Sequence, residues 1–289
     1  MSLPNFLVIG AYRSGTTTLH DALGAHREIF VPKRKEPSFF AFDGVSPTSS
    51  PTYRRSITSL EEYERLFEAA GDENAVGEVS PEYLANPTAC PRIKARVPGA
   101  RLVAVLRNPI ERAHSDFLMY VGDGREPDAD FGRALGEQEE RYRAGLPTGY
   151  YVRTGFYGRQ LRPFFEAFPQ KQIQIHLFDD FARDPVGVLR AVFAFLRVQP
   201  GLGPEMVERR NVSGVPRNAA MRALMRVAGR VAPAVPRPLR RPAKALLARG
   251  LKRPGLRPEH RRQLAEIYRD DLRELELLLG RSLEHWLRD

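Results

Sequence analysis

A glycine-bounded loop near the start of the chain holds the residues best suited to bind an anion. The segment from Gly10 to Thr17 has the sequence GAYRSGTT, follows an apolar run over 6–9, and precedes a helical pattern that begins after Gly15. In such a strand–loop–helix the backbone N–H groups converge on an anion, and the helix N-terminus adds a partial positive charge. The side chains of the loop add one cation and several donors: Arg13, Ser14, Thr16 and Thr17. The spacing predicts a phosphate-binding loop.

This loop lacks the lysine of a P-loop nucleotide triphosphatase. Those enzymes carry Gly-Lys-Ser/Thr at the end of the loop, whereas here Gly15 is followed by Thr16 and the cation is Arg13. No clear acidic magnesium ligand follows a later strand, so a nucleotide kinase-like enzyme is the alternative and not the favoured interpretation. A tight turn without a ligand would not require so many hydrogen-bond donors.

A second polar pair lies about ninety residues further along the chain. Arg107 ends an apolar strand pattern over 101–106, and Asn108-Pro109 closes it before a helical pattern over 110–120. Ser115 then lies about two turns into that helix. The simpler alternatives are a surface cation and a helix serine without a ligand.

The elements that position these residues alternate along the chain. Buried-strand patterns cover 6–9, 75–79, 101–106 and 172–177, and helical patterns cover 59–70, 155–168 and 186–196. This alternation predicts an α/β fold, a P-loop-like three-layer α/β/α arrangement with a central parallel sheet. We expect a single domain over 1–289, with a basic, proline-rich lid or insertion at 217–258 and a C-terminal amphipathic helix at 258–286.

The positive charge is concentrated in one segment. The chain has 289 residues and a formal net charge of +10, and residues 217–258 hold twelve Lys and Arg without any Asp or Glu. The remainder has 33 basic and 35 acidic residues and is close to neutral. A nucleic-acid-binding fold spreads its basic residues over a face, so no nucleic acid is expected. The segment suits an anionic membrane surface, an acidic polymer or a carrier protein, and a solvated lid is the plain alternative.

The cysteine content and the first residues of the chain bear on the cellular location of the protein. Cys90 is the only cysteine, which excludes an internal disulfide and a Cys-based zinc cluster. No secretory leader pattern or membrane-spanning run is present in the sequence. We predict a cytoplasmic protein, with peripheral attachment at a membrane as an extension, and no metal.

Two segments, in this order, resemble the sulfotransferases that use 3′-phosphoadenosine-5′-phosphosulfate (PAPS). FLVIGAYRSGTTTLHDAL resembles their 5′-phosphosulfate loop, and RLVAVLRNPIERAHSDF resembles the strand–turn–helix that holds the 3′-phosphate. The similarity extends through GEVSPEYLANP and covers most of residues 5–218. Within this family, the chain looks like a bacterial sulfotransferase that resembles the Golgi heparan-type carbohydrate enzymes.

The resemblance implies a role for each matching residue. Arg13 would contact the 5′-phosphosulfate and its bridging oxygen, with Ser14, Gly15, Thr16 and Thr17 as donors around it. Arg107 and Ser115 would hold the 3′-phosphate. Arg217, in Val215-Pro216-Arg217, would close over the cofactor from the other side.

The same resemblance assigns the general base. Glu36 lies in KEPSFF, which matches the Glu-x-x-Phe-Phe context of the heparan-type base, although a surface ion pair is the simpler alternative. The cytosolic branch uses a histidine, so His114 and His20 are the runners-up. One departure is Val79, where the heparan-type enzymes carry a lysine; Glu78, just before it, would lie near the acceptor or simply end a strand.

These matches imply sulfuryl transfer from PAPS to a hydroxyl, or less readily an amine, with adenosine 3′,5′-bisphosphate as product. Carbohydrate, lipid and natural-product acceptors all stay open. A membrane or nucleic-acid adaptor that uses residues 217–258 is the third interpretation.

Overall fold

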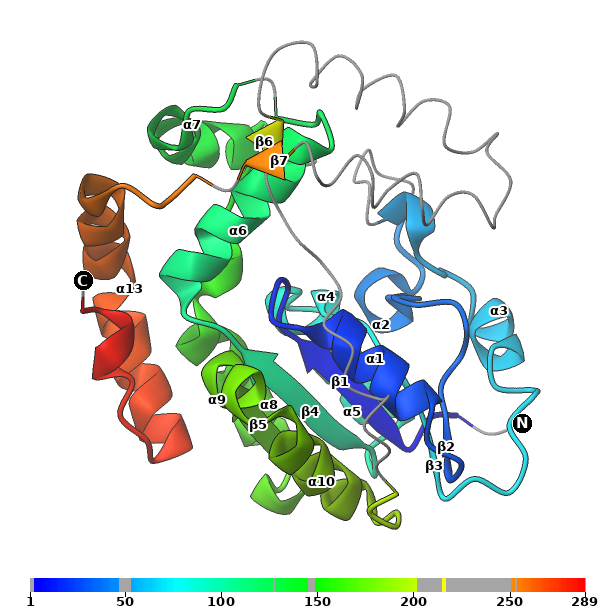
Figure 1. Cartoon of the computed structure of the whole chain (residues 1–289). Helices are drawn as coiled ribbons and strands as arrows, with labels where there is room; N and C mark the ends of the chain where they lie inside the picture. The colour runs from blue at the N-terminus through cyan, green and yellow to red at the C-terminus, as the bar shows by residue number, and fades with distance from the viewer. Residues whose placement is uncertain are drawn as a thin grey trace. The chain divides into compact units, whose positions relative to one another are not determined.

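The computed structural model describes residues 3–46, 53–126, 128–144, 149–201, 215–216, 251–252 and 254–288 (Figure 1). The chain forms two compact units. The first, called the sheet unit, comprises Met1–Pro109, Phe156–Arg210 and Ile267–Arg288. The second unit comprises Ile110–Gly155 and Asn211–Glu266. Arg217 and most of the basic segment lie outside the described residues.

The sheet unit is built on five parallel strands in the order β2-β3-β1-β4-β5. Their bounds are β1 Phe6–Gly10, β2 Ile29–Phe30, β3 Ala75–Val79, β4 Arg101–Leu106 and β5 Ile173–Leu177. All but the two-residue β2 were predicted from the sequence. The central strand β1 pairs with β3 on one side and with β4 on the other, so the strand order reverses there. Ligands of open α/β sheets bind at the carboxyl ends of the strands at such a reversal.

Helices cover both faces of this sheet, which confirms the three-layer α/β/α prediction (Figure 1). Side chains of α1 (Thr16–Gly24), α9 (Phe178–Arg183) and α10 (Pro185–Leu196) form one core with Phe6 and Val8 of β1. On the other face lie α4 (Glu82–Ala85) and α5 (Ala89–Arg96), with α8 (Tyr157–Ala167) packed against them. Leu7 and Leu102, paired across β1 and β4, are fully buried.

Shorter elements complete the sheet unit. The segment after β2 forms α2 (Phe39–Phe42), η1 (Tyr53–Arg55) and α3 (Leu60–Arg65), and η3 (Gln170–Gln172) precedes β5. The helix predicted over 59–70 is thus shorter than expected. Its start is fixed by Ser59, whose hydroxyl accepts the N–H of Glu62.

The C-terminal helix α13 spans Pro258–Leu279, so the prediction of one helix to residue 286 is wrong at its end. Gly280 adopts φ +61°, a left-handed conformation that terminates a helix, and a short turn η6 (Glu284–Trp286) follows. Trp286 is buried; its indole N–H donates to Asp179, and its carbonyl oxygen accepts from the Asn108 amide at 2.9 Å. The chain end is thereby attached to the segments that follow β4 and β5.

The second unit contains most of α6 (Pro109–Gly122), then α7 (Phe131–Arg143), η2 (Arg153–Gly155) and the first turns of α13. The helix predicted over 110–120 is confirmed as α6. A two-residue antiparallel pair, β6 (Val215–Pro216) with β7 (Leu251–Lys252), joins the residues directly before the basic segment to residues near its end. Among the helices that the structure describes, none combines the length and the apolar content needed to cross a membrane.

Candidate active site at the carboxyl edge of the sheet

The loop between β1 and α1 has the geometry of an anion site. Gly15 adopts φ +85°, and a Cβ there would lie 3.3 Å from the Phe181 ring, so the position requires glycine. Helix α1 starts directly after it, without a side-chain cap and without an acidic residue in its first turn. Ser14 is fully buried in the loop. The first N–H groups of α1 are therefore placed to bind an anion.

Arg107 and the loop are brought together at this edge. Nη1 of Arg107 donates to the backbone carbonyl oxygen of Arg13, with 3.3 Å between the two atoms. The Arg107 guanidinium lies over the Phe178 ring, 5.1 Å from its centroid. The backbone of the loop at Arg13 and the side chain of the residue that follows β4 are thus in contact. Ser115 lies in the second unit, where it is buried in α6.

Glu36 lies beside the end of β3 in a backbone turn of unusual conformation. Its N–H donates to the Val79 carbonyl oxygen at 3.2 Å. Both Glu36 (φ +56°) and Ser38 (φ +51°) are left-handed, and such non-glycine residues cost about 1 kcal/mol or more each. The Ser38 N–H donates to the Ser80 hydroxyl at 2.9 Å. These buried contacts hold the turn, while the Glu36 side chain stays 41% exposed.

Lys35 is the functional candidate that the sequence analysis did not single out. Its ammonium donates to the Thr17 hydroxyl at 2.5 Å, in the first turn of α1, and lies 3.1 Å from a Glu36 carboxylate oxygen. Lys33 to Lys35 are three successive cations in the sequence, and the pattern does not indicate which of them turns inward.

Two further carboxylates lie near Glu36. Glu78, at the end of β3, is buried and accepts from the hydroxyls of Tyr83 at 2.5 Å and Tyr63 at 3.4 Å. Burial raises the pKa of Glu78 to about 7, against the opposing effect of these hydrogen bonds. Glu78 is therefore part of a buried tyrosine cluster and not an open acceptor contact.

Glu82 opens α4 and contacts the loop, a role that the sequence analysis missed. The Tyr12 hydroxyl donates to Glu82 at 2.5 Å. Burial raises the pKa of Glu82 to about 7; the Tyr12 hydrogen bond opposes the shift and the negative charge of Glu36 adds to it. Its place four residues after Glu78 in GEVSPEY was the available signal.

The two histidines proposed as alternative bases have structural partners. His20 Nε2 lies 3.2 Å from the Pro32 carbonyl oxygen, and its Nδ1 lies 3.6 Å from Asp21. The His114 ring packs on Phe131 inside the second unit, with the ring centroids 5.1 Å apart. Of the proposed bases, Glu36 combines exposure with a place beside the loop.

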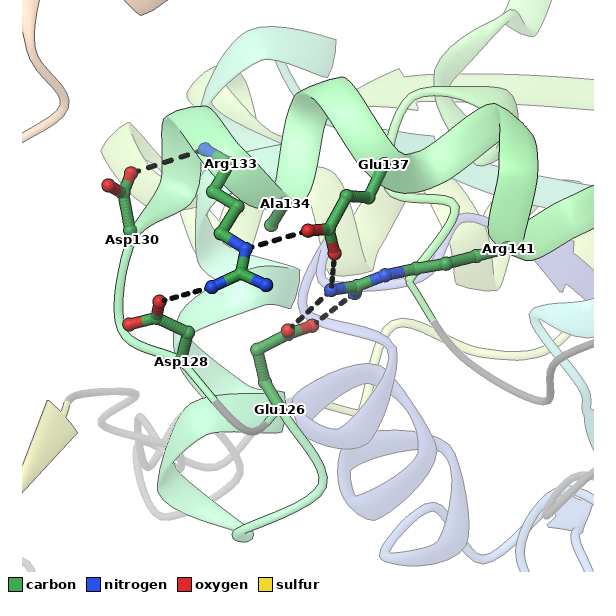
Figure 2. Close-up of a pocket in the computed structure, with 7 residues that line it drawn as sticks. All are labelled: Glu126, Asp128, Asp130, Arg133, Ala134, Glu137 and Arg141. Atoms are coloured by element: carbon green, nitrogen blue, oxygen red, sulfur yellow. Dashed lines mark hydrogen bonds and ion pairs between the residues drawn. The ribbon is translucent and has the colours of Figure 1, made fainter.

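The second unit contains a hollow of about 210 Å³ whose charges are already paired. Figure 2 shows Arg141 bound by both Glu126 and Glu137, with Arg133 on the other side of Glu137. Tyr151 also donates to Glu126, at 2.5 Å. This arrangement is a structural ion network, and the proposed cofactor residues are not part of it.

Comparisons with known proteins agree with the geometry of the sheet unit. Residues 4–200 match the group described as "Sulfotransferase family". The chain is 31% identical over 134 residues to membrane-associated sulfotransferase kil1 of Dictyostelium discoideum, covering 45% of this chain and 26% of that protein. It is 26% identical over 196 residues to heparan sulfate glucosamine 3-O-sulfotransferase 3A1 of Mus musculus, covering 67% of this chain and 46% of the relative. The chain thus spans less than half the length of these relatives.

Solved structures show the same similarity. A sulfotransferase from Alicyclobacillus acidocaldarius superposes with a TM-score of 0.78 at 29% identity, over 100% of both chains. Mouse sulfotransferase SULT7A1, solved in complex with PAP, gives a TM-score of 0.54 at 13% identity, over 96% of this chain and 86% of the other. At that identity the second comparison shows the fold alone.

Proposed function

This chain belongs to the sulfotransferase family, and from that premise we propose that it transfers a sulfuryl group from PAPS to a hydroxyl of an acceptor. The observation that carries the proposal is the meeting of Arg107 with the loop at Arg13, beside the uncapped first turn of α1. Both cations and the helix N-terminus lie where the strand order reverses. This is the place at which a parallel sheet binds a nucleotide.

The residues present fit such a donor. Arg13 and the N–H groups that follow Gly15 suit the 5′-phosphosulfate, with Ser14, Thr16 and Thr17 as further donors. Arg107, with Ser115, is proposed to hold the 3′-phosphate, and Arg217 to close the site. The last two assignments rest on the resemblance in sequence to PAPS-dependent sulfotransferases, because Ser115 belongs to the second unit and Arg217 lies outside the described residues.

In the proposed mechanism, PAPS supplies the sulfuryl group. Glu36 accepts the proton of the acceptor hydroxyl as the new oxygen–sulfur bond forms. The bond from sulfur to the bridging oxygen breaks, and its electron pair remains on the phosphate of adenosine 3′,5′-bisphosphate. Arg13 stabilises the charge that develops there. Positioning and charge stabilisation dominate in transfers of this kind.

Glu36 is preferred to Glu78 because a base must reach the acceptor. The Glu78 carboxylate is buried and held by two tyrosine hydroxyls, whereas the Glu36 side chain is 41% exposed. We expect Glu36→Gln to lower turnover about 100-fold or more, since the amide keeps the shape but cannot take the proton. Binding of adenosine 3′,5′-bisphosphate, measured by calorimetry, should stay near wild type.

Glu61→Gln is the matched control, because Glu61 is an exposed carboxylate in α3. Near-normal turnover of Glu36→Gln would contradict its assignment as base. The role would then pass to Glu82, Glu78 or one of the histidines.

The acceptor is proposed only as a class: a carbohydrate, lipid or natural-product hydroxyl. Support comes from the relatives, one of which is named for heparan sulfate glucosamine. The proposal is tested with ³⁵S-labelled PAPS and a panel made of desulfated heparan, chondroitin, a phenol and a fatty alcohol. Label transfer to one acceptor class identifies the substrate, and failure to use PAPS at all would contradict the activity.

Residues 217–258 are proposed to attach the protein to an anionic membrane surface or to a carrier protein. The support is their charge: twelve Lys and Arg without an acidic residue. Co-sedimentation with vesicles of phosphatidylserine, absent with phosphatidylcholine alone, would support the membrane version. No difference between the two lipids would contradict it. A cytoplasmic location stays a prediction from the sequence.

A further inference from the structure

Lys35 connects two parts of the candidate site that belong to different elements. Its ammonium contacts the Thr17 hydroxyl of α1 and a Glu36 carboxylate oxygen, at 2.5 and 3.1 Å. Thr17 lies in the first turn of α1, on the side of the sulfuryl donor in the proposed function. Glu36 lies on the side of the acceptor. One cation therefore spans the distance between the proposed base and the proposed donor subsite.

The neighbouring cations behave differently, so charge alone does not explain this contact. Lys33 is exposed, and Arg34 pairs with Glu62 at 2.7 Å, where both side chains are more than 40% exposed. The Lys35 side chain is only 25% exposed. The backbone directly after it is left-handed at Glu36 and again at Ser38. Conformations of that kind persist only where the surrounding structure holds them.

Glu36 has two carboxylates near it and a cation, Lys35, in contact with it. The negative charge of Glu36 adds to the raised pKa of both Glu78 and Glu82, so these two carboxylates lie within electrostatic reach of it. A general base must be ionised before it can take a proton. Within the described residues, Lys35 is the one ion-pair partner of Glu36.

We infer that Lys35 is a positioning residue for the transfer, holding the ionised Glu36 carboxylate at a fixed distance from the first turn of α1. The inference rests on the proposed function, in which Glu36 is the base. Lys35 acts through Glu36, and it leaves the binding of the nucleotide to Arg13, Arg107 and the loop N–H groups.

The test compares Lys35→Met with Lys35→Arg and with the control Lys33→Met. Turnover is measured as release of adenosine 3′,5′-bisphosphate from PAPS, with the best acceptor of the panel and with water. We expect Lys35→Met to lower kcat about 10- to 100-fold, as misplacement of a reacting group does. The KM for PAPS should change less than about threefold, since the ammonium is not assigned to the donor. Lys35→Arg should recover most of the loss, and Lys33→Met should match wild type.

A double-mutant cycle shows whether Lys35 acts through Glu36. In the Glu36→Gln background, Lys35→Met should lower kcat little further, because the group that Lys35 positions no longer takes the proton. Full additivity of the two losses would overturn the inference. So would unchanged turnover in Lys35→Met, or a loss found only in the KM for PAPS. Lys35→Gln repeats the cycle if the methionine variant does not fold.

The two sets of variants distinguish a wrong role for Lys35 from a wrong assignment of Glu36 as the base. Wild-type turnover in Glu36→Gln removes the proposed base, and with it the role of Lys35. A large loss in Glu36→Gln together with full activity in Lys35→Met leaves the base in place and removes only the positioning role.

Discussion

Glu78 is the residue at which burial has the clearest consequence for stability. Its carboxylate accepts hydrogen bonds from the hydroxyls of Tyr83 and Tyr63, and burial raises its pKa from 4.5 to about 7. An acid with a raised pKa keeps its proton in the folded state over a range in which the unfolded chain has released it. Its contribution to stability is therefore complete below about pH 4.5 and is lost as the pH rises through about 7.

Glu78→Gln should remove most of that pH dependence, because the amide resembles the protonated acid. We expect the free energy of unfolding at pH 8 to rise by about 3 kcal/mol over wild type, with little change at pH 4.5. Glu82, whose pKa is also raised, leaves a residual slope. Urea denaturation at both pH values measures the difference, with the exposed Glu68→Gln as control. Equal effects at the two pH values would contradict a raised pKa of Glu78 in the folded state.

Residue types and order were enough to predict the loop and Arg107, but not Lys35 or Glu82. The loop is recognisable because glycine, hydroxyl and cation recur at short spacing between a strand and a helix. Lys35 contacts α1 and is followed by left-handed backbone at Glu36, a conformation that no local propensity of glutamate favours. Only the folded chain shows which of three successive cations meets the site.

At the scale of elements, the sequence predicted the strands of five or six residues in the parallel sheet and missed the two-residue β2. β2 has two residues, too few to show a pattern. The end of α13 was misjudged because Leu283 and Trp286 continue the apolar pattern beyond Gly280. These two side chains are buried, but after a left-handed glycine and in a separate turn.

A buried carboxylate of α13 contacts the start of α8. Asp271 accepts the backbone N–H groups of Gly158 at 2.9 Å and Arg159 at 3.0 Å, in the first turn of α8. It thereby caps a helix that has no side-chain cap of its own.

Asp271→Ala should lower the free energy of unfolding by about 2 kcal/mol, because one buried and one partly buried backbone donor lose their acceptor. Thermal or urea denaturation measures the loss. Asp270→Ala, one residue away and 85% exposed, serves as control and should stay within about 0.5 kcal/mol of wild type. Equal stability of the two variants would show that solvent replaces the cap.

At the scale of the whole molecule, charge and site are separated along the chain. The net charge of +10 comes from residues 217–258, while the proposed nucleotide contacts at Arg13 and Arg107 lie in the remainder, which is close to neutral. Composition alone would have suggested a nucleic-acid-binding protein; the location of the charge argued against it. The pairing of Arg107 with Ser115 stays a prediction, because the two residues belong to different units.

The central claim is that this edge of the sheet binds a 3′-phosphorylated adenine nucleotide without the chemistry of a kinase. Thermal denaturation of the full chain tests it, with adenosine 3′,5′-bisphosphate, ADP, or ATP with magnesium added at equal concentration. A ligand that binds only the folded state stabilises it, by about 2.7 kcal/mol at a hundred times its dissociation constant. We predict a rise of several degrees in Tm with adenosine 3′,5′-bisphosphate, little with the other two, and loss of most of the rise in Arg13→Ala and Arg107→Ala. Stabilisation by magnesium-ATP alone, or an undiminished rise in both variants, would contradict the account.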